Sequence, residues 1–349
     1  MDLIDLEARA AESLPPASYD YIAGGADDEL TLADNVAAWN RYRIRPHVLR
    51  DVSTVDLATT LLGARVSTPV HVAPVAYHRL VHAEGEVATA RGAAAAGAVF
   101  TVSTMATTSI EDVAAAAPDG PRWFQLYVHV DRDLTAWLVE RAEAAGYRAL
   151  VLTVDTPRIG SRRRDGVHGF VLPEGLELAN IASYPGAVAS ASTVAYATAS
   201  FDPSLTTEAV AWLAGLSSLP VVVKGVLRGD DARACVEAGA RAVLVSNHGG
   251  RQLDGVIATA DALAEVADAV GDDAEVYVDG GVRRGSDVLR ALALGARAVF
   301  VGRPVSWALH EGGAEGVEAL LGWLREQTAL AFALAGVASC GDVRRDLLG

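Results

Sequence analysis

Cysteine is scarce in this chain of 349 residues, since Cys235 and Cys340 are the only two. Two thiols so far apart in the sequence exclude a disulfide-built fold and a CxxC metal site. The opening segment MDLIDLEARAAESLPP also lacks the basic start and the apolar core of a signal peptide. From these absences we expect a cytoplasmic protein without a bound metal.

Long apolar runs and an excess of basic residues are also missing. No run of about 18 apolar residues occurs, so no segment is expected to span a membrane. The 29 Lys and Arg residues are outnumbered by 44 Asp and Glu residues, which gives a formal net charge of -15. Nucleic acids and anionic membranes repel such a chain, and they are excluded as partners. An anionic substrate therefore requires a local group of basic side chains.

Eight short apolar segments alternate with Ala-rich segments of helical periodicity. Such near-continuous apolar segments are typical of parallel strands that are buried on both faces. A doubly wound sheet would have about six strands and a GxGxxG turn after the first, and neither occurs. We therefore predict an α/β protein, a (β/α)8 TIM barrel that forms a single domain over residues 1–349. The segments begin at Pro69, Val99, Trp123, Ala149, Pro220, Ala242, Glu275 and Ala298.

Three regions lie outside this alternation. Residues 1–65 are predicted to form an N-terminal helical cap over the bottom of the barrel. Residues 159–204, after the fourth strand, are too long for an ordinary barrel loop and are expected to be a lid over the active site, with a mobile Ala/Ser-rich middle. Residues 316–336 are apolar on more than one face, which indicates packing against the barrel or another subunit.

The polar residues that close the strands form one candidate site, because active sites of such barrels lie at the carboxyl ends of the strands. Two glycine-rich turns, DGGVRRG from Asp279 and GRP from Gly302, close the last two strands, where this fold usually binds phosphate. Glycine amides together with Arg283 and Arg303 can hold a phosphate dianion. The full set is Ser103, Gln125, Tyr127, Thr153, Asp155, Lys224, Asn247, His248, Arg251, Asp279, Arg283 and Arg303.

Lys224 closes an entirely apolar strand, where an unpaired charge is costly. One explanation is a structural salt bridge. The other is a cation placed against a ring that becomes negative during the reaction, as a reduced flavin does. A phosphate site, a buried lysine and the polar strand ends Ser103, Gln125 and Thr153 together suggest FMN, although those three residues are equally consistent with satisfied core positions.

His248 lies in SNHGGRQLDG, directly after a predicted strand, where adjacent glycines allow the backbone to approach a ligand closely. Asp155, at the end of the fourth strand, can orient the imidazole and stabilise its protonated form, which makes His248 a candidate general base. Arg251 and Arg162 can clamp a carboxylate, although the SRRR segment that contains Arg162 is equally consistent with a solvated charge run. Tyr21 and Tyr127 are candidate hydrogen-bond donors or packing residues.

The segments that carry these residues resemble the FMN-dependent 2-hydroxy-acid oxidases and dehydrogenases, the group of glycolate oxidase, lactate oxidase and mandelate dehydrogenase. The likeness covers nearly the whole chain, and APVAYHRL is most similar to the 4-hydroxymandelate oxidases. The shared segments, in chain order, are YDYIAGG, APVAYHRLVHAEGE, WFQLYV, LTVDTPRIG, VVVKGV, SNHGGRQLDG, YVDGGVRRG and VFVGRP.

The resemblance implies a role for each candidate residue. His248 is implied as the base with Asp155 as its partner, Arg251 and Arg162 bind the substrate carboxylate with Tyr21, and Tyr127 contacts the substrate hydroxyl. Lys224 is implied to stabilise the reduced flavin. The implied FMN-binding residues are Pro74, Val75, Ala76, Ser103, Gln125, Thr153, Lys224, Ser246, His248, Gly249, Arg251, Asp279, Gly281, Arg283, Gly302 and Arg303.

The expected reaction is oxidation of an (S)-2-hydroxy acid to the 2-oxo acid, with oxygen reduced to hydrogen peroxide. The likeness implies that Ala76 favours an oxidase, where dehydrogenases tend to have glycine. Ala83 stands where the family usually has a proline, and Met105 stands where glycolate oxidase has a tryptophan. Because Met105 is flexible, the pocket is expected to accept a larger, aromatic side chain of the mandelate type. The likeness also implies tetramers or octamers.

Alternative functions remain open at this point. A dehydrogenase or monooxygenase could use the same scaffold, and a biosynthetic flavoprotein could act on a different substrate. A catalytically silent flavin-binding protein or an isomerase acting on a sugar phosphate would also fit a phosphate-binding barrel.

Overall fold

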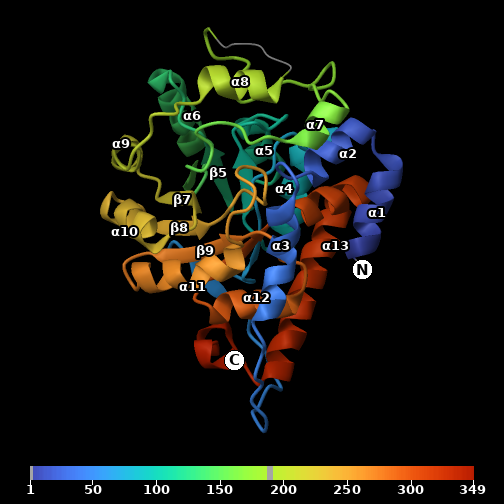
Figure 1. Cartoon of the computed structure of the whole chain (residues 1–349), viewed down its shortest axis with the longest axis vertical. Coiled ribbons are helices and arrows are strands. Elements are labelled where there is room, and N and C mark those ends of the chain that lie inside the picture. The colour runs from blue at the N-terminus through green and yellow to red at the C-terminus, as the bar shows by residue number, and fades with distance from the viewer. Residues whose placement is uncertain (1–2, 187–191) are drawn as a thin grey trace.

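A computed structural model describes residues 3–186 and 192–349. Its centre is a closed barrel of eight parallel strands in the order β10-β3-β4-β5-β6-β7-β8-β9, surrounded by helices (Figure 1). Each predicted strand segment forms one of these strands, so the prediction of a TIM barrel is confirmed. The strands are β3 (Val70–Val72), β4 (Phe100–Ser103), β5 (Arg122–Leu126), β6 (Leu150–Thr153), β7 (Val221–Val226), β8 (Ala242–Val245), β9 (Glu275–Asp279) and β10 (Ala298–Val301).

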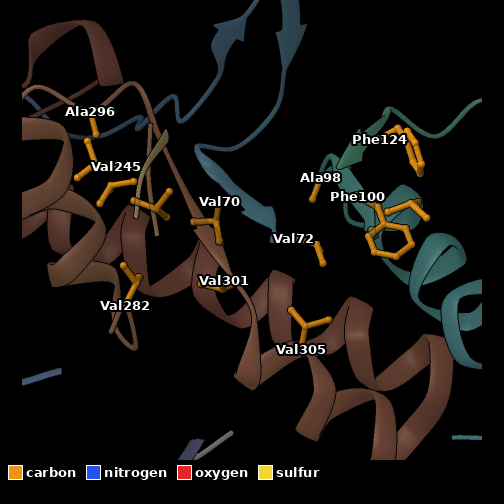
Figure 2. Packing of buried hydrophobic residues seen from close by; sticks show 14 of the residues in the cluster. Val70, Val72, Ala98, Phe100, Phe124, Val245, Val282, Ala296, Val301 and Val305 are labelled. Atoms are coloured by element: carbon orange, nitrogen blue, oxygen red, sulfur yellow. The ribbon is translucent and has the colours of Figure 1, made fainter. Parts of the chain in front are cut away.

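The barrel strands are buried on both faces, which explains their continuous apolar sequence. Inside the barrel, the rings of Trp123, Tyr277 and Phe300 lie 5.5–5.7 Å apart and fill the space between the strands. Outside it, the strands pack against the helices. Figure 2 shows Val72 and Val301, from the neighbouring strands β3 and β10, beside Val305 at the start of α13.

Helices follow the strands as the sequence predicts, and α13 carries a kink at Gly312 and Gly313. α6 shows how they begin, because the Asp131 carboxylate before it accepts hydrogen bonds from the amides of Asp133 and Leu134. In the described residues no helix is long and apolar enough to cross a membrane. The barrel helices are α4 (Gly85–Ala95), α5 (Ile110–Ala116), α6 (Arg132–Ala144), α9 (Glu208–Leu216), α10 (Gly229–Glu237), α11 (Thr259–Val270), α12 (Gly285–Ala293) and α13 (Arg303–Ala335), with short 3-10 helices η1 (Trp39–Arg41), η2 (His78–Leu80), η3 (Cys340–Asp342) and η4 (Arg345–Leu347).

The N-terminal segment contains α1 (Leu3–Ser13), α2 (Pro16–Ala23), α3 (Leu30–Ala38) and the hairpin of β1 (Thr59–Leu61) and β2 (Ala64–Val66). The expectation that its helices cap the bottom of the barrel is wrong. The hairpin closes that end, since Leu61 and Val66 belong to the apolar cluster of the barrel interior.

Helices α2 and α3 lie at the opposite end, where the strands terminate in polar groups. Asn35 of α3 and Asn247, which follows β8, exchange two side-chain hydrogen bonds of 2.8 Å. The physical reason is that the carboxyl ends of the strands offer polar partners to a helix, whereas the amino ends need only the two apolar side chains of the hairpin.

The long connection between β6 and β7 contains α7 (Arg163–Val167) and α8 (Thr193–Ser200) before it reaches α9. Helix α7 packs against α2, and Figure 1 shows α7 and α8 together at one end of the molecule. The middle of this connection, which the sequence suggests is mobile, includes residues 187–191, and these lie outside the described residues.

Gly281, just after β9, explains how closely α3 approaches the barrel. Its φ is +76°, and a Cβ there would lie 1.8 Å from the carbonyl oxygen of Asn35. The contact shows that this glycine makes room for the backbone of α3.

We expect Gly281→Ala to lower the melting temperature strongly, because α3 must move away from the barrel, at a cost of about 3 kcal/mol or more. Gly63→Ala is the matched control, because Gly63 has a φ of +81° but no atom within 4 Å of the added Cβ. Gly63→Ala should lower the stability only by the cost of placing a non-glycine residue in the left-handed conformation, roughly 1–2 kcal/mol. Thermal unfolding of both variants checks this, and equal losses would contradict the tight docking of α3.

Candidate active site

A cavity of about 1040 Å³, open to solvent, lies at the carboxyl ends of the barrel strands. It brings together nearly all the predicted site residues, although they come from every part of the chain. Asp155, Ser246 and Asn247 are not in its lining. Asp155 and Ser246 contact lining residues directly, whereas the side chain of Asn247 bonds to Asn35 of α3. The predicted residues that line it are Tyr21, Pro74, Val75, Ala76, Ser103, Met105, Gln125, Tyr127, Thr153, Arg162, Lys224, His248, Gly249, Arg251, Asp279, Gly281, Arg283, Gly302 and Arg303.

The segment SNHGG enters the cavity as a turn of three successive left-handed residues. The φ angles are +59° at His248, +65° at Gly249 and +75° at Gly250. A Cβ on Gly249 would lie 2.8 Å from Nη1 of Arg303, and one on Gly250 would lie 2.6 Å from the amide nitrogen of Leu32. The two glycines therefore let this turn fit between an arginine of the site and helix α3, and they aim His248 into the cavity.

His248 and Asp155 form a hydrogen-bonded pair, with 2.8 Å between Nδ1 and Oδ1. Burial lowers the pKa of His248, and the nearby Lys224 lowers it further while Asp155 opposes the shift. For Asp155, burial favours the neutral acid, yet His248 and Lys224 outweigh it and lower the pKa to about 2. The pair is therefore an ionised carboxylate that accepts from Nδ1–H of a neutral imidazole, which leaves Nε2 free to accept a proton.

Gly225 in β7 makes this pair fit. Its φ is +112°, and a Cβ there would lie 2.7 Å from the Cβ of Asp155. The strand register shifts at the same place, between Lys224 and Val226. A glycine next to the lysine thus opens the space in which Asp155 turns toward His248.

Lys224 is buried, with 5% of its side chain exposed, and lies between polar partners from β9 and from the turn after β8. Its Nζ donates to Oγ of Ser246 at 3.1 Å and lies 3.6 Å from Oδ2 of Asp279. Buried Oδ1 of Asp279 and Oδ2 of Asp155 have no hydrogen-bond partner among the described residues. The salt-bridge explanation is therefore correct in part, but the incomplete pairing also suits a ligand with hydrogen-bonding groups.

Arg251 and Arg162 face the same part of the cavity. Arg251 is anchored through Nη1 to the carbonyl oxygens of Tyr21 at 2.6 Å and Gly24 at 2.9 Å. Burial and the charge of Arg162 lower the pKa of Arg251 to about 10. Of the three arginines in SRRR, only Arg162 lines the cavity. Arg163 and Arg164 form ion pairs with Asp28 and Glu29 instead. Two neighbouring guanidiniums in a cavity favour an anion between them.

Arg303 and Arg283 form a second basic group at the ends of β10 and β9. Arg303 donates to the carbonyl oxygens of Ile22, Gly24 and Gly249 at 2.8–3.0 Å. Burial and the charges of Arg251 and Arg283 lower its pKa to about 9. One N–H on each terminal nitrogen is left for another acceptor. This corner therefore fits the phosphate that the sequence predicts there.

Ser103, Gln125 and Thr153 form a hydrogen-bonded row across β4, β5 and β6. Oγ of Ser103 donates to Oε1 of Gln125 at 3.1 Å, and Nε2 of Gln125 donates to Oγ1 of Thr153 at 3.0 Å. These three side chains satisfy one another's hydrogen bonds and also line the cavity, so the structure is consistent with both explanations given from the sequence. The row, the unpaired carboxylate oxygens and the basic corner together fit the polar ring and phosphate of FMN.

Several residues at the site carry no strong sequence signal. Gln252 holds the segment after β6 by donating to the carbonyl oxygens of Asp155 and Arg158 at 2.8 and 2.9 Å. Another example is the aromatic cluster behind the lining residue Tyr21, where Phe170 lies 4.2 Å from Tyr21 and 6.4 Å from Tyr77, measured between ring centroids. Residues that line the cavity without having been predicted are Ile22, Ala73, Ile159, Gly280, Val282, Phe300 and Val301.

Comparison with known proteins adds independent findings. A family model described as FMN-dependent dehydrogenase matches residues 10–349. The L-lactate oxidase of Nostoc sp. (strain PCC 7120) is 47% identical over 356 residues, which cover 100% of this chain and 98% of that protein. Human 2-hydroxyacid oxidase 1 is 48% identical over 347 residues, which cover 97% of this chain and 93% of that protein. The solved structure of mandelate oxidase with (S)-4-hydroxymandelic acid matches with a TM-score of 0.93 and 45% identity, covering 100% of this chain and 98% of that one.

The charge state of the His248–Asp155 pair can be tested by titration. We expect His248 to titrate with a pKa below the usual value, because burial and Lys224 disfavour the imidazolium. Asp155→Asn should lower this pKa further, because it removes the negative charge that favours the protonated ring. NMR of histidine-labelled protein across the acidic pH range measures both, and the signal of His168, which pairs with Asp20 on the surface, serves as the internal control. A rise of the His248 pKa in Asp155→Asn would disprove this electrostatic assignment.

Proposed function

This chain belongs to the FMN-dependent dehydrogenase family, and from that premise we propose that it oxidises an (S)-2-hydroxy acid to the 2-oxo acid and reduces oxygen to hydrogen peroxide. The observation that carries the proposal is that an imidazole hydrogen-bonded to a carboxylate lines one cavity together with a pair of guanidiniums. A 2-hydroxy acid offers the matching groups, a carboxylate for the arginines and a hydroxyl proton for the base.

The substrate-binding residues have distinct tasks in this proposal. Arg162 and Arg251 bind the carboxylate, and Tyr21 adds a hydrogen bond. Burial raises the pKa of Tyr127, so its hydroxyl stays protonated and can hydrogen-bond the oxygen that becomes the ketone. His248 accepts a proton at Nε2, and Asp155 stabilises the imidazolium that forms.

The cofactor-binding residues come from the ends of all eight barrel strands. FMN, when bound, supplies the two-electron oxidation and passes the electrons to oxygen. Arg283 and Arg303 bind its phosphate, and Lys224 offsets negative charge near the ring. The remaining proposed contacts are Pro74, Val75, Ala76, Ser103, Gln125, Thr153, Ser246, Gly249, Asp279, Gly281 and Gly302, although Gly281 has its closest contact with α3.

Two features support the finer parts of the proposal. Ala76 lines the cavity, where the family likeness favours alanine in oxidases. Met105 lines it as well, and so do Tyr21 and Ile159, so the pocket has flexible and aromatic walls that suit an aromatic side chain. Together with the similarity to mandelate oxidase, this supports a substrate of the mandelate or 4-hydroxymandelate type.

The proposal extends to assembly and location. Leu330 and Leu334 of α13 are 52% and 71% exposed. Such an exposed apolar strip supports a homotetramer or octamer. A cytoplasmic location also remains part of the proposal.

The base is tested first. The purified protein should be yellow and should be bleached by substrate without oxygen. His248→Asn should keep the colour but reduce its flavin at least about 100-fold more slowly, because it lacks the group that accepts the proton. Stopped-flow absorbance measures the rate, and one mole of peroxide per mole of substrate separates an oxidase from a dehydrogenase or monooxygenase. A colourless protein would refute the function, and normal bleaching of His248→Asn would remove His248 from the role of base.

Met105 tests the size of the substrate. We expect mandelate and 4-hydroxymandelate to bleach the flavin faster than glycolate or lactate does. Met105→Trp should reverse this order, because a bulky rigid ring fills the space of the aromatic side chain, while Met105→Leu should preserve it as the volume-matched control. If Met105→Trp leaves the preference unchanged, the substrate side chain does not contact residue 105.

A further inference from the structure

Two phenylalanines of the β6–β7 connection stack on the two tyrosines of the cavity. The ring centroids of Phe170 and Tyr21 lie 4.2 Å apart with 20° between the ring planes. Those of Phe201 and Tyr127 also lie 4.2 Å apart, with 21° between the planes. Aromatic pairs at this separation stabilise each other beyond the burial of their surface.

We propose that Phe170 and Phe201 are positioning residues, each of which fixes the ring of one tyrosine and thereby the place where its hydroxyl meets the substrate. The inference rests on the proposed function, because that function assigns the substrate carboxylate to Tyr21 and the reacting hydroxyl to Tyr127. It adds two residues that line no part of the cavity.

Phe201 is held rigidly beside Tyr127. It forms a β-bridge with His129, two positions after Tyr127. On either side of it, the amide of Val130 donates to the carbonyl oxygen of Ser200 at 2.8 Å, and the amide of Asp202 donates to that of Val128 at 3.0 Å. Phe201 is 5% exposed. The segment that carries Phe201 is thus joined to the segment that carries Tyr127.

Phe170 is attached through α7 to Asp20, the residue before Tyr21 in α2. Its amide donates to the carbonyl oxygen of Asp165 at 2.8 Å, which joins it to α7. That helix and the residue after it are tied to Asp20, since Nδ1 of His168 lies 2.7 Å from Oδ2 and Arg164 lies 3.7 Å from Oδ1. The guanidinium of Arg251 lies 5.0 Å from the centroid of the Tyr21 ring. The Tyr21 ring, on which Phe170 stacks, therefore also contacts Arg251, which is proposed to bind the substrate carboxylate.

The position of the hydroxyl depends on these stacks. A tyrosine hydroxyl moves when its ring swings about the Cα–Cβ bond, and a ring stacked on a fixed neighbour cannot swing freely. A displacement of about 1 Å at a reacting group can cost roughly 100-fold in rate. Because the two tyrosines contact different groups of the substrate, loss of the two stacks should have different kinetic effects.

The first part of the test uses single variants of the FMN-containing protein. Phe201→Leu should lower the limiting rate of flavin reduction by about 10- to 100-fold, while the dissociation constant of an unreactive 2-oxo acid, read from the visible spectrum, stays within about twofold. Phe170→Leu should instead raise that dissociation constant by roughly 2- to 12-fold, with a smaller change in the limiting rate. Phe201→Tyr and Phe170→Tyr keep the rings and should restore both values.

The second part shows whether each phenylalanine acts through its tyrosine. In a Tyr127→Phe background, which lacks the hydroxyl, Phe201→Leu should change the limiting rate by less than about twofold, whereas Phe170→Leu should keep its full effect on binding. Phe332→Leu, at a fully buried position in α13, is the control for a general loss of packing and should leave both values unchanged. If Phe201→Leu does not fold, Phe201→Met replaces it as a substitution closer in volume.

The outcomes separate this inference from the function on which it rests. If the wild-type flavin is not reduced by any 2-hydroxy acid, the proposed function fails. If the wild type is reduced but Phe201→Leu equals it, or slows the reaction by the same factor in the Tyr127→Phe background, only the positioning role is overturned. Equal effects of both phenylalanine variants on rate and binding would overturn it as well.

Discussion

A buried ammonium at the end of β7 is the constraint on which the site depends. Lys224 has almost no access to water, and such a charge is tolerated only where carboxylates and hydrogen bonds surround it. Asp279 from β9 and Ser246 after β8 contact it directly. The same charge lowers the pKa of Asp155 and that of His248. Lys224 therefore acts with burial to keep the imidazole neutral, and with His248 to keep the carboxylate ionised, the charge states that a base needs before its substrate arrives.

Closure of the barrel brings these groups together, and the sequence predicts closure well. Parallel strands buried on both faces must be apolar at almost every position, so each strand is visible as a short continuous segment. The N-terminal region gave a wrong prediction for a physical reason. Helical periodicity shows that a helix has a buried face, but it does not show which end of the barrel that face covers. The hairpin that closes the bottom has strands of only three residues, β1 and β2, too short for a periodic pattern.

The site was predictable to a similar degree. Residues at strand ends, such as Gln125, Thr153 and Lys224, could be assigned to one cavity because the fold fixes where strand ends meet. Phe170 and Phe201 could not, because they lie in a long connection whose path depends on contacts made only in three dimensions. The roles of glycines were also only partly visible. Gly225 and Gly281 make room for Asp155 and for the backbone of α3, and nothing in the sequence distinguishes such packing from contact with a ligand.

The distribution of charge explains how a chain with a net charge of -15 could bind two anions. Five basic side chains line the described cavity, namely Arg162, Lys224, Arg251, Arg283 and Arg303, against the single carboxylate of Asp279. At physiological ionic strength the field of a surface charge is screened within about 8–10 Å, so the acidic exterior acts weakly inside the cavity. Buried guanidiniums are screened far less, and burial together with the charges of neighbouring arginines lowers the pKa values of Arg251 and Arg303, so that a bound anion would stabilise their charged forms. An acidic surface with a basic cavity thus repels long polyanions that must lie along the surface, whereas a small monocarboxylate interacts mainly with the cations inside.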